Sequence, residues 1–273
     1  MNKKIAITGS TGGIFKELCK KLISDNYDLI LVDRNKEKSE ENRRELLELK
    51  SSANIELLTA DMADFNSVKK VTEELKKCDF DYLIIGAAIY NVPLKKLELG
   101  YNNVFQVNFI SPYYMVKELL SVKDIKVIVT SSIAYNYEKT KEDDIDFSNN
   151  KKASHIYGNS KRFLMFSLMK EYESLDKVRF AHPGITLTKM TNHYPRSINW
   201  LVKIGIGLIF PKPKKACLNI YEAIKNATPY MSWIGPKYLN LYGKPTVKKN
   251  LKISEEEINS INKMANEIYE KVR

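Results

Sequence analysis

Short apolar runs rich in β-branched residues alternate along this chain with longer amphipathic segments, and this alternation restricts the possible folds more than any other feature. The runs cover residues 5–8, 29–32, 55–58, 82–85, 126–130 and 178–182. Strands that alternate with helices, such as the segments 15–24 and 35–51, predict βαβ units. Such strands are apolar along their length because helices cover both faces of the sheet. We therefore expect an α/β fold: a doubly wound parallel sheet in a three-layer α/β/α arrangement, forming a single domain over residues 1–273.

The composition is that of a soluble protein without structural metals. The 273 residues, 44% of them hydrophobic, can bury a large core. Neither the three cysteines (Cys19, Cys78 and Cys217) nor the three histidines have the spacing of a disulfide framework or a metal site, so we expect no metal. The apolar stretch after the first four residues is too short for a signal peptide, and no stretch reaches the roughly 18 apolar residues of a membrane span. We expect a cytoplasmic setting.

The formal net charge of +11 raises the question of a nucleic-acid partner. Lysines and arginines occur along the whole chain and are interleaved with glutamate in segments such as NKEKSEENRREL. Solvated, lysine-rich helix faces explain this pattern more simply than a groove that follows a phosphate backbone. We therefore expect no specific nucleic-acid partner.

A glycine-rich turn, TGSTGGIF at residues 8–15, follows the first expected strand and leads into a helix. Glycines in this place let the backbone approach a pyrophosphate, whose charge the helix N-terminus stabilises. Glycines also serve plain tight turns, but the position in the first βα unit favours phosphate binding. The residues expected to make this contact are Gly9, Ser10, Thr11, Gly12, Gly13 and Ile14.

The second expected strand ends in Asp33 and Arg34, which point to different cofactors. An acidic residue here can accept hydrogen bonds from the adenosine ribose and would repel a 2′-phosphate, which favours NAD. An arginine is the residue type that accommodates that phosphate in NADP. A turn aspartate beside a solvated arginine is the simpler alternative. We expect NAD or NADP as cofactor, with the balance slightly towards NAD.

Tyr157 and Lys161 are four residues apart in a segment expected to be helical, so their side chains face the same way. A cation near a phenol favours the phenolate and brings its pKa, normally near 10, closer to neutral pH. The tyrosine then becomes usable as a general acid or base. This pair alone is common by chance, and its context decides its meaning.

That context resembles the short-chain dehydrogenase/reductase family, over about residues 4–245. The turn resembles the family's TGxxxGxG motif, with Phe15 in place of the third glycine. Asp61 and Met62 resemble an Asp-hydrophobe pair beside the adenine. Where the family shows Asn-Asn-Ala-Gly this chain has Ile85 followed by three small residues that can still let the cofactor pass, namely Gly86, Ala87 and Ala88. The resemblance implies a Rossmann-type, NAD(P)-binding domain.

The resemblance also assigns an active site. Ser132 matches the serine that polarises the substrate carbonyl, with Ser131 as the alternative if the register differs by one. Asn108 matches the asparagine that anchors a relay water. Tyr157 would exchange the hydroxyl proton of the substrate. Lys161 would adjust the pKa of Tyr157 and hold the nicotinamide ribose. These residues imply an oxidoreductase that interconverts an alcohol and a carbonyl by hydride transfer.

The later motifs refine this expectation. Pro183, Gly184 and Thr188 resemble the segment that binds the nicotinamide carboxamide. The 25 positions from Ser132 to Tyr157 exceed the usual spacing, and this insert resembles the retinol-dehydrogenase-like branch, which implies a lipophilic small-molecule substrate. The altered residues at 15 and 85–88 favour the alternative, a non-catalytic dinucleotide-binding or sensor protein of the same fold.

Two segments fall outside the alternation. Residues 186–216 are expected to form a substrate lid, and the apolar run at 198–210 with the lysines that follow it suggests peripheral membrane contact through residues 198–215. A C-terminal helix is expected over 254–272, opened by a capping box of Ser254 and Glu257. Its apolar stripe should pack on the core or on a second copy in a homo-oligomer, and consists of Ile258, Ile261, Ala265, Ile268 and Val272.

Overall fold

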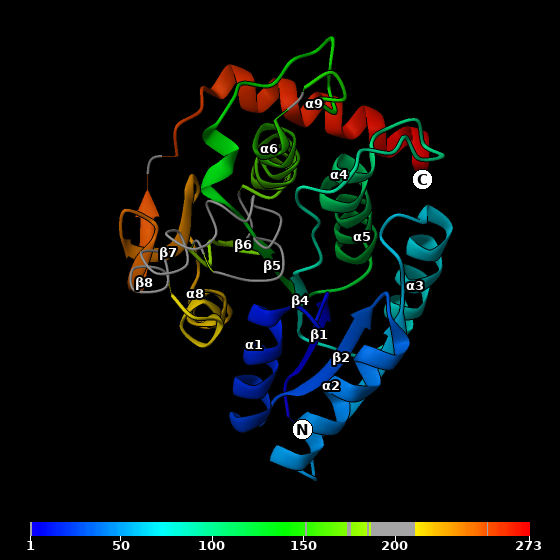
Figure 1. Ribbon diagram of the computed structural model, residues 1–273, viewed down its shortest axis with the longest axis vertical. Helices are drawn as coiled ribbons and strands as arrows, with labels where there is room; N and C mark the ends of the chain where they lie inside the picture. Colours follow the sequence, from blue (N-terminus) through cyan, green and yellow to red (C-terminus); the bar gives the residue numbers. More distant parts are fainter. Residues whose placement is uncertain (1, 151, 174–175, 185, 187–210, 250) are drawn as a thin grey trace, which may run out of the picture.

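The computed structural model describes residues 2–150, 152–173, 176–184, 186, 211–249 and 251–273. Its strands form one eight-stranded sheet in the order β3-β2-β1-β4-β5-β6-β7-β8 (Figure 1). The strands are β1 (Lys4–Thr8), β2 (Asp28–Asp33), β3 (Ile55–Thr59), β4 (Tyr82–Ile85), β5 (Lys126–Thr130), β6 (Val178–Ala181), β7 (Ser232–Tyr238) and β8 (Tyr242–Lys249). The six expected strands are all present.

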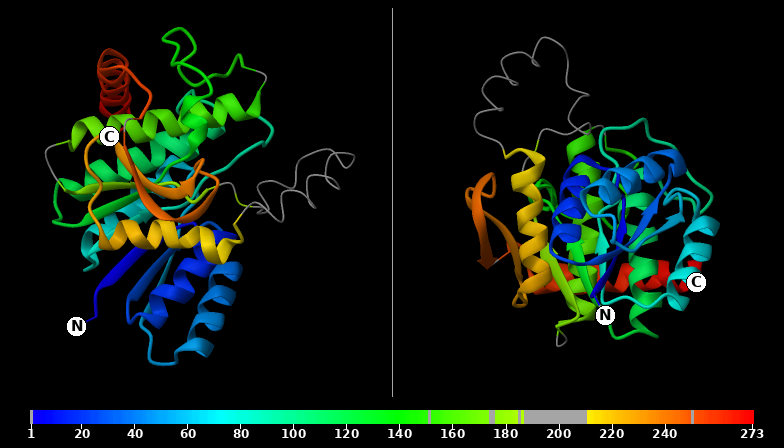
Figure 2. Two further views of the ribbon diagram at one scale, coloured as in Figure 1. Left: turned by 90° about the vertical axis from the view of Figure 1, so that its left-hand side faces the viewer. Right: turned by 90° about the horizontal axis from the view of Figure 1, so that it is seen from below.

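Helices cover both faces of the sheet. They are α1 (Gly13–Ser24), α2 (Lys36–Leu49), α3 (Phe65–Lys77), α4 (Asn103–Phe105), the π-helical turn η1 (Gln106–Ile110), α5 (Ser111–Leu120), the 3-10 turn η2 (Ile133–Asn136), α6 (Ala153–Glu171), α8 (Pro213–Lys225) and α9 (Glu255–Val272). Alternate residues of the strands enter two cores. One core joins the sheet to α3, α5 and α6, and the other joins it to α1, α2 and α8, as the two views of Figure 2 show. The three-layer α/β/α arrangement is confirmed.

The outer edge of the sheet differs from the expectation. Strands β1 to β7 pair in parallel, but β8 pairs antiparallel with β7. The turn between them has two central residues with positive φ, Leu239 at 50° and Asn240 at 56°, as in a type I′ turn. The predicted parallel sheet is confirmed for β1 to β7, and β8 is an added antiparallel edge strand, because a short hairpin returns the chain without a crossover helix.

The C-terminal helix lies where the sequence predicted it. Ser254 caps α9 by accepting a hydrogen bond from the Glu257 amide at 3.2 Å. The carboxylate of Glu257 binds Arg162 of α6 instead, at 2.8 Å from Nε. All five residues of the expected stripe are buried against the core, so the helix packs on its own chain. Among the described helices, none is both long and apolar enough to cross a membrane.

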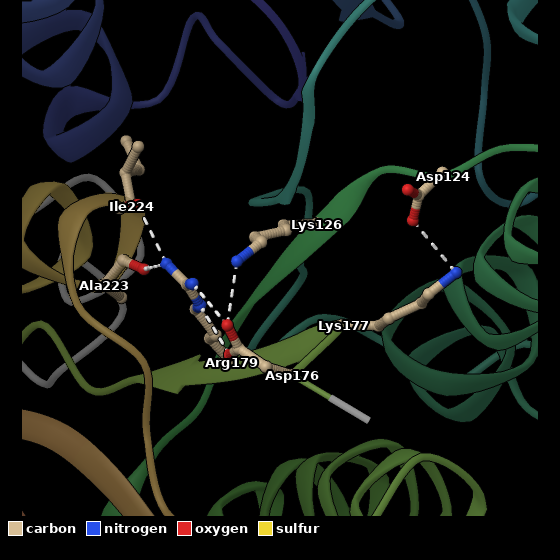
Figure 3. A network of polar contacts seen from close by, with 7 residues as sticks. All are labelled: Asp124, Lys126, Asp176, Lys177, Arg179, Ala223 and Ile224. Atoms are coloured by element: carbon tan, nitrogen blue, oxygen red, sulfur yellow. Dashed lines mark hydrogen bonds and ion pairs between the residues drawn. The ribbon is translucent and has the colours of Figure 1, made fainter. Parts of the chain in front are cut away.

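A polar network ties the start of β5 and β6 to the end of α8 (Figure 3). Arg179, nearly fully buried, donates to the carbonyls of Ala223 at 3.1 Å and Ile224 at 2.9 Å. Asp176 accepts from the same arginine at 2.9 Å and from Lys126 at 2.8 Å. A cation at the C-terminus of a helix neutralises its unpaired carbonyls. The network fixes α8 at the amino ends of the strands, the edge opposite the candidate site.

Candidate active site

The candidate residues gather at the carboxyl ends of the parallel strands, where ligands bind in sheets of this kind. The glycine-rich turn leaves β1 at Gly9, whose φ is 75° and where an added Cβ would lie 2.8 Å from Ala87 Cα. Only glycine permits both. Gly12 precedes α1, and no described side chain caps the first turn of that helix. Its open amide groups form a cradle that suits a pyrophosphate.

Phe15 and Gly86, two of the departures from the family pattern, fit each other. Phe15 is buried, and a Cβ added at Gly86 would lie 2.5 Å from two atoms of its ring. The ring therefore fills space that a side chain at position 86 would need. Thr8 Oγ1 accepts from the amides of Gly86 at 3.0 Å and Ala87 at 3.2 Å. Sequence reasoning missed this support, which holds the end of β4 without the family's asparagines.

The carboxylate of Asp33 makes its hydrogen bonds within the protein. Its carboxylate is 3% exposed and accepts hydrogen bonds from Ser10 Oγ at 2.5 Å, from Ser39 Oγ at 3.1 Å and from the Thr11 amide at 3.2 Å. It therefore locks the glycine-rich turn against α2, and sequence reasoning missed Ser39. The Arg34 side chain is 72% exposed, with its guanidinium 4.0 Å from the Asp61 carboxylate.

The residues that follow β3 are held in place by hydrogen bonds to other parts of the protein. Asp61 Oδ1 accepts from the Ala63 amide at 2.9 Å, while Oδ2 faces Arg34. Met62 is buried, and its carbonyl accepts from Ser111 at 2.7 Å. The half-exposed Asp61 carboxylate thus lies beside the end of β2, where the resemblance expects an adenine.

Tyr157 and Lys161 lie one turn apart on α6, with Lys161 Nζ 5.8 Å from the centre of the Tyr157 ring. Nζ donates to the carbonyl of Thr130, the last residue of β5, at 3.1 Å. Burial lowers the pKa of Lys161 to about 8. Burial also raises the pKa of Tyr157, and the Ser132 hydroxyl acts in the opposite direction. The expected lowering of the phenol pKa is therefore not found, because desolvation exceeds the stabilisation of the phenolate.

The geometry distinguishes the two serines. Ser132 is half-buried and hydrogen-bonds Tyr157. Ser131 is almost fully buried, and its amide continues the sheet by donating to Ala181 at 2.8 Å. Close approach of α6 to the serine turn depends on Gly158, where an added Cβ would lie 2.2 Å from the Ala134 carbonyl oxygen. Sequence reasoning missed this glycine, although a glycine inside a helical pattern often marks close packing.

Asn108 is buried in the π-helical turn η1. Its Oδ1 accepts from the Ile89 amide at 2.8 Å, and its Nδ2 donates to the Ile89 carbonyl at 2.9 Å and to Ser160 at 3.1 Å. Both amide hydrogens are used, so the side chain holds the loop after β4 and cannot donate to a relay water. π-Helical turns are frequent at functional sites. Tyr90, in the same loop, meets the Tyr157 ring edge-on at 5.3 Å.

The segment after β6 is held by the β7–β8 hairpin. His182 is buried with Nε2 3.0 Å from the Asn240 carbonyl and Nδ1 3.4 Å from the Ser131 carbonyl. Burial lowers the pKa of His182 to about 4. Pro183 accepts from Asn219 of α8, and Gly184 has a φ of 87°.

Part of this region lies outside the described residues. Thr188, the run at 198–210 and most of the expected lid over 186–216 belong there. The described end of that lid, residues 213–216, is the first turn of α8. This turn belongs to the helix that covers the sheet, and the lid itself stays a prediction.

Comparisons with known proteins show the family. A family model described as short chain dehydrogenase matches residues 3–198. Human retinol dehydrogenase 14 is 27% identical over 262 residues, which cover 86% of this chain and 77% of that protein. Human polyprenol dehydrogenase is 23% identical over 250 residues, which cover 85% and 75%.

Other similar proteins match less of their own length or only the fold. The WW domain-containing oxidoreductase of Gallus gallus is 29% identical over 154 residues, 54% of this chain, and the chain spans 37% of its length. A crystal structure of an uncharacterized protein from Mycobacterium paratuberculosis has the same fold, with a TM-score of 0.73 and 18% identity over 99% of this chain and 92% of that one. The chain therefore belongs to the short-chain dehydrogenase/reductase family of NAD(P)-dependent oxidoreductases.

Proposed function

We propose that the protein interconverts an alcohol and a carbonyl by hydride transfer, with Tyr157, Lys161 and Ser132 as its reacting groups. The observation that carries this proposal is the meeting of Ser132 and Tyr157 beside the Lys161 ammonium, next to a cradle that fits a dinucleotide. A bound nicotinamide would give or accept the hydride. Gly9 to Gly13 would hold its pyrophosphate against the open end of α1.

The shifted pKa values indicate how the protein handles the proton. Because burial raises the pKa of Tyr157, the resting phenol is protonated at neutral pH and ready to act as a general acid. Lys161, with a pKa of about 8, carries its charge in most molecules at pH 7. Its ammonium would stabilise the phenolate left when the proton moves to the carbonyl oxygen, which Ser132 holds.

We infer NADP as the cofactor, against the slight expectation of NAD. That expectation required Asp33 to face the adenosine ribose. The carboxylate is instead buried and engaged by Ser10, Thr11 and Ser39. Arg34 is the exposed charge at this corner, and a 2′-phosphate would replace its weak contact with Asp61.

We propose a lipophilic substrate. Two relatives are named for retinol and polyprenol, both lipophilic alcohols. In this chain an apolar cluster adjoins Tyr157: Ile156 and Phe147 are buried together, with Ile89 and Val92 packed against them. Peripheral membrane contact through residues 198–215 would suit such a substrate, but residues 198–210 of that segment lie outside the described part of the chain.

Turnover tests this function against the alternative of a non-catalytic dinucleotide sensor. The protein would be given NADPH and a panel of aldehydes and ketones, including retinaldehyde, and cofactor oxidation would be followed. The active-site assignment predicts turnover by the wild type and a loss of about 10²–10⁴-fold in Tyr157→Phe. The sensor hypothesis predicts NADPH binding with no turnover in either protein.

A further inference from the structure

The positive charge of the chain is concentrated in its carboxyl-terminal third. Between Asp176 and Glu255 the sequence has one acidic residue, Glu222, against fourteen lysines and arginines. Outside this stretch acidic residues slightly outnumber basic ones, so the stretch accounts for the whole net charge of +11. The interleaving of lysine with glutamate on α2 does not extend to it.

The structure brings seven of the described lysines of this stretch together on two neighbouring elements. Four belong to the β7–β8 hairpin, and three precede or open α8: Lys237, Lys244, Lys248 and Lys249, and Lys212, Lys214 and Lys215. Both elements meet at Gly184, where an added Cβ would lie 3.0 Å from Pro236 Cγ and 3.4 Å from Pro211 Cγ.

These seven lysines have no counter-charge among the residues that the structure describes, since none forms an ion pair there. Lys214 and Lys215 also occupy the first turn of α8, where the helix dipole favours acidic residues. Their positions therefore oppose helix stability and leave a surface of one sign.

The hairpin turn adds exposed apolar side chains to this charge. Leu239 is 81% exposed, and the Tyr238 and Tyr242 rings beside it stack at 5.5 Å with about half of each side chain in solvent. Leu239 has a φ of 50°, in the left-handed region that leucine rarely adopts and that asparagine or glycine would favour. The turn thus presents a leucine to solvent although a polar residue would suit its backbone better. Figure 2 shows this hairpin at the outer edge of the molecule.

Protection of the sheet edge explains only part of this arrangement. Lysines and a proline, here Pro245, discourage an exposed edge strand from pairing with another chain. That role gives no reason for an exposed leucine and two exposed tyrosines at the turn, which would favour association. Apolar and aromatic groups at the turn, with Lys237 and Lys244 beside it and Lys248 and Lys249 farther along β8, instead match what a bilayer interface binds: apolar groups at the headgroup boundary and cations against anionic lipid.

We propose that the β7–β8 hairpin and the first turn of α8 form a surface that binds anionic lipid bilayers reversibly. The turn lies close to the candidate active site, because the Asn240 carbonyl binds His182 and a Cβ at Gly184 would lie 2.9 Å from the Leu241 oxygen. If the proposed function holds, docking would bring the site to the lipid that contains its substrate. The surface itself does not depend on that function.

Sedimentation with vesicles tests the surface without cofactor or substrate. The full chain would be mixed with vesicles of phosphatidylcholine alone or with phosphatidylserine added. We expect binding only to the anionic vesicles, and release as the ionic strength rises from about 0.05 to about 0.5 M. Replacing Lys244, Lys248 and Lys249 by glutamine should weaken binding about 100-fold, since each lysine at an anionic surface contributes about fivefold.

Two matched variants make the test specific. Replacing the exposed, unpaired lysines Lys70, Lys77 and Lys263 on α3 and α9 by glutamine gives the same change in net charge and should leave binding unchanged. Leu239→Asn should weaken binding about tenfold by removing apolar contact, while its free energy of unfolding stays equal or rises because asparagine suits the turn. Lipid binding and stability would then change in opposite directions.

Four results would overturn the proposal. The wild type could remain in the supernatant with anionic vesicles at low salt. Both triple variants could lose binding equally, which would mean that net charge alone is responsible. The hairpin variants could bind as the wild type does, or the same surface could bind a labelled single-stranded oligonucleotide in preference to vesicles. Loss of turnover has no bearing on any of these results.

Discussion

At the scale of single residues, burial shifts the pKa values of the proposed catalytic pair, Tyr157 and Lys161, in opposite directions. Tyr157 is held protonated, whereas the pKa of Lys161 falls to about 8 because its ammonium is 2% exposed and bonded to one carbonyl, that of Thr130. A buried cation is unfavourable for folding. The folded state therefore gives up stability to keep this lysine in the site.

Lys161→Met should separate stability from activity. A shift from 10.5 to about 8 corresponds to ~3 kcal/mol, and the lost hydrogen bond to Thr130 offsets about 1 kcal/mol of the gain. We expect the variant to be about 2 kcal/mol more stable at pH 7 and inactive. The gain should shrink as the pH rises from about 8 towards 10.5, because the wild-type lysine then loses its proton in the folded state only.

Denaturant unfolding at several pH values measures this effect. Lys263→Met, at an exposed position of α9, controls for the loss of one lysine. A Lys161→Met variant that is less stable than the wild type at pH 7 would show that the side chain is favourably solvated or paired when folded, contrary to the burial described.

Arg34 and Asp33 should have different effects on cofactor binding. Arg34→Ala should weaken NADPH binding about tenfold and leave NADH binding nearly unchanged. The reason is that only the 2′-phosphate of NADPH would contact this exposed charge. Asp33→Asn should weaken both cofactors together and lower stability, since the carboxylate holds Ser10, Thr11 and Ser39. Titrations of each protein with both cofactors decide this. If the wild type bound NADH more tightly than NADPH, this would support the initial expectation of NAD that was based on Asp33.

At the scale of elements, the junction of α1 with β4 depends on two coupled substitutions. Gly86→Asn alone should destabilise the fold and weaken cofactor binding, because the Cβ of the asparagine would overlap the Phe15 ring. Phe15→Gly alone should cost about 3 kcal/mol through the cavity it leaves. The double variant, which restores the family's residues at both positions, should be more stable than the sum of the single effects predicts.

A thermodynamic cycle of the four proteins, measured by denaturant unfolding and NADPH titration, gives the coupling energy between positions 15 and 86. We expect it to exceed about 1 kcal/mol. Additive effects would mean that the Phe15 ring does not occupy the space that a side chain at position 86 needs. The two substitutions would then have to be explained separately by their effects on cofactor binding.

The sequence indicated the site residues that carry chemistry but not those that hold them. Residue type and spacing pointed to Tyr157 and Lys161, and the family resemblance added Ser132 and gave the pair its meaning. The roles of Thr8 and Gly158 arise from contacts between segments far apart in the chain, and residue type alone does not encode such contacts. The direction of the Tyr157 pKa shift was mispredicted for a related reason: spacing reveals the neighbouring lysine but not the depth of burial.

The β7–β8 hairpin was not predicted, because its residues are not typical of strands. β7 contains Gly235 and Pro236, both unusual inside strands, and β8 is polar and exposed, with Pro245 near its centre. Neither strand shows the apolar run that revealed the other six strands. Pairing along the sheet edge, rather than local pattern, makes them strands.

At the scale of the whole molecule, the sheet separates two tasks. The network around Arg179 fixes α8 at the amino ends of the strands (Figure 3), and the carboxyl ends carry the cradle, the catalytic groups and the hairpin turn. The alternation of apolar runs was enough to predict the sheet and the helices on its two faces. It could not reveal that the positive charge lies over one edge of the sheet, because that requires the tertiary placement of the hairpin beside α8.

Transfer of deuterium from cofactor to product tests the central claim of hydride transfer at this site most directly. The protein would be incubated with NADPH carrying deuterium on the transferable position of C4 and with a lipophilic aldehyde, and the product alcohol analysed by mass spectrometry. We expect one deuterium on the carbinol carbon with the wild type and none above background with Tyr157→Phe, while NADPH binding is equal in both. A wild type that binds NADPH but transfers no deuterium to any carbonyl of the panel, or a Tyr157→Phe variant that transfers it at the wild-type rate, would contradict this account.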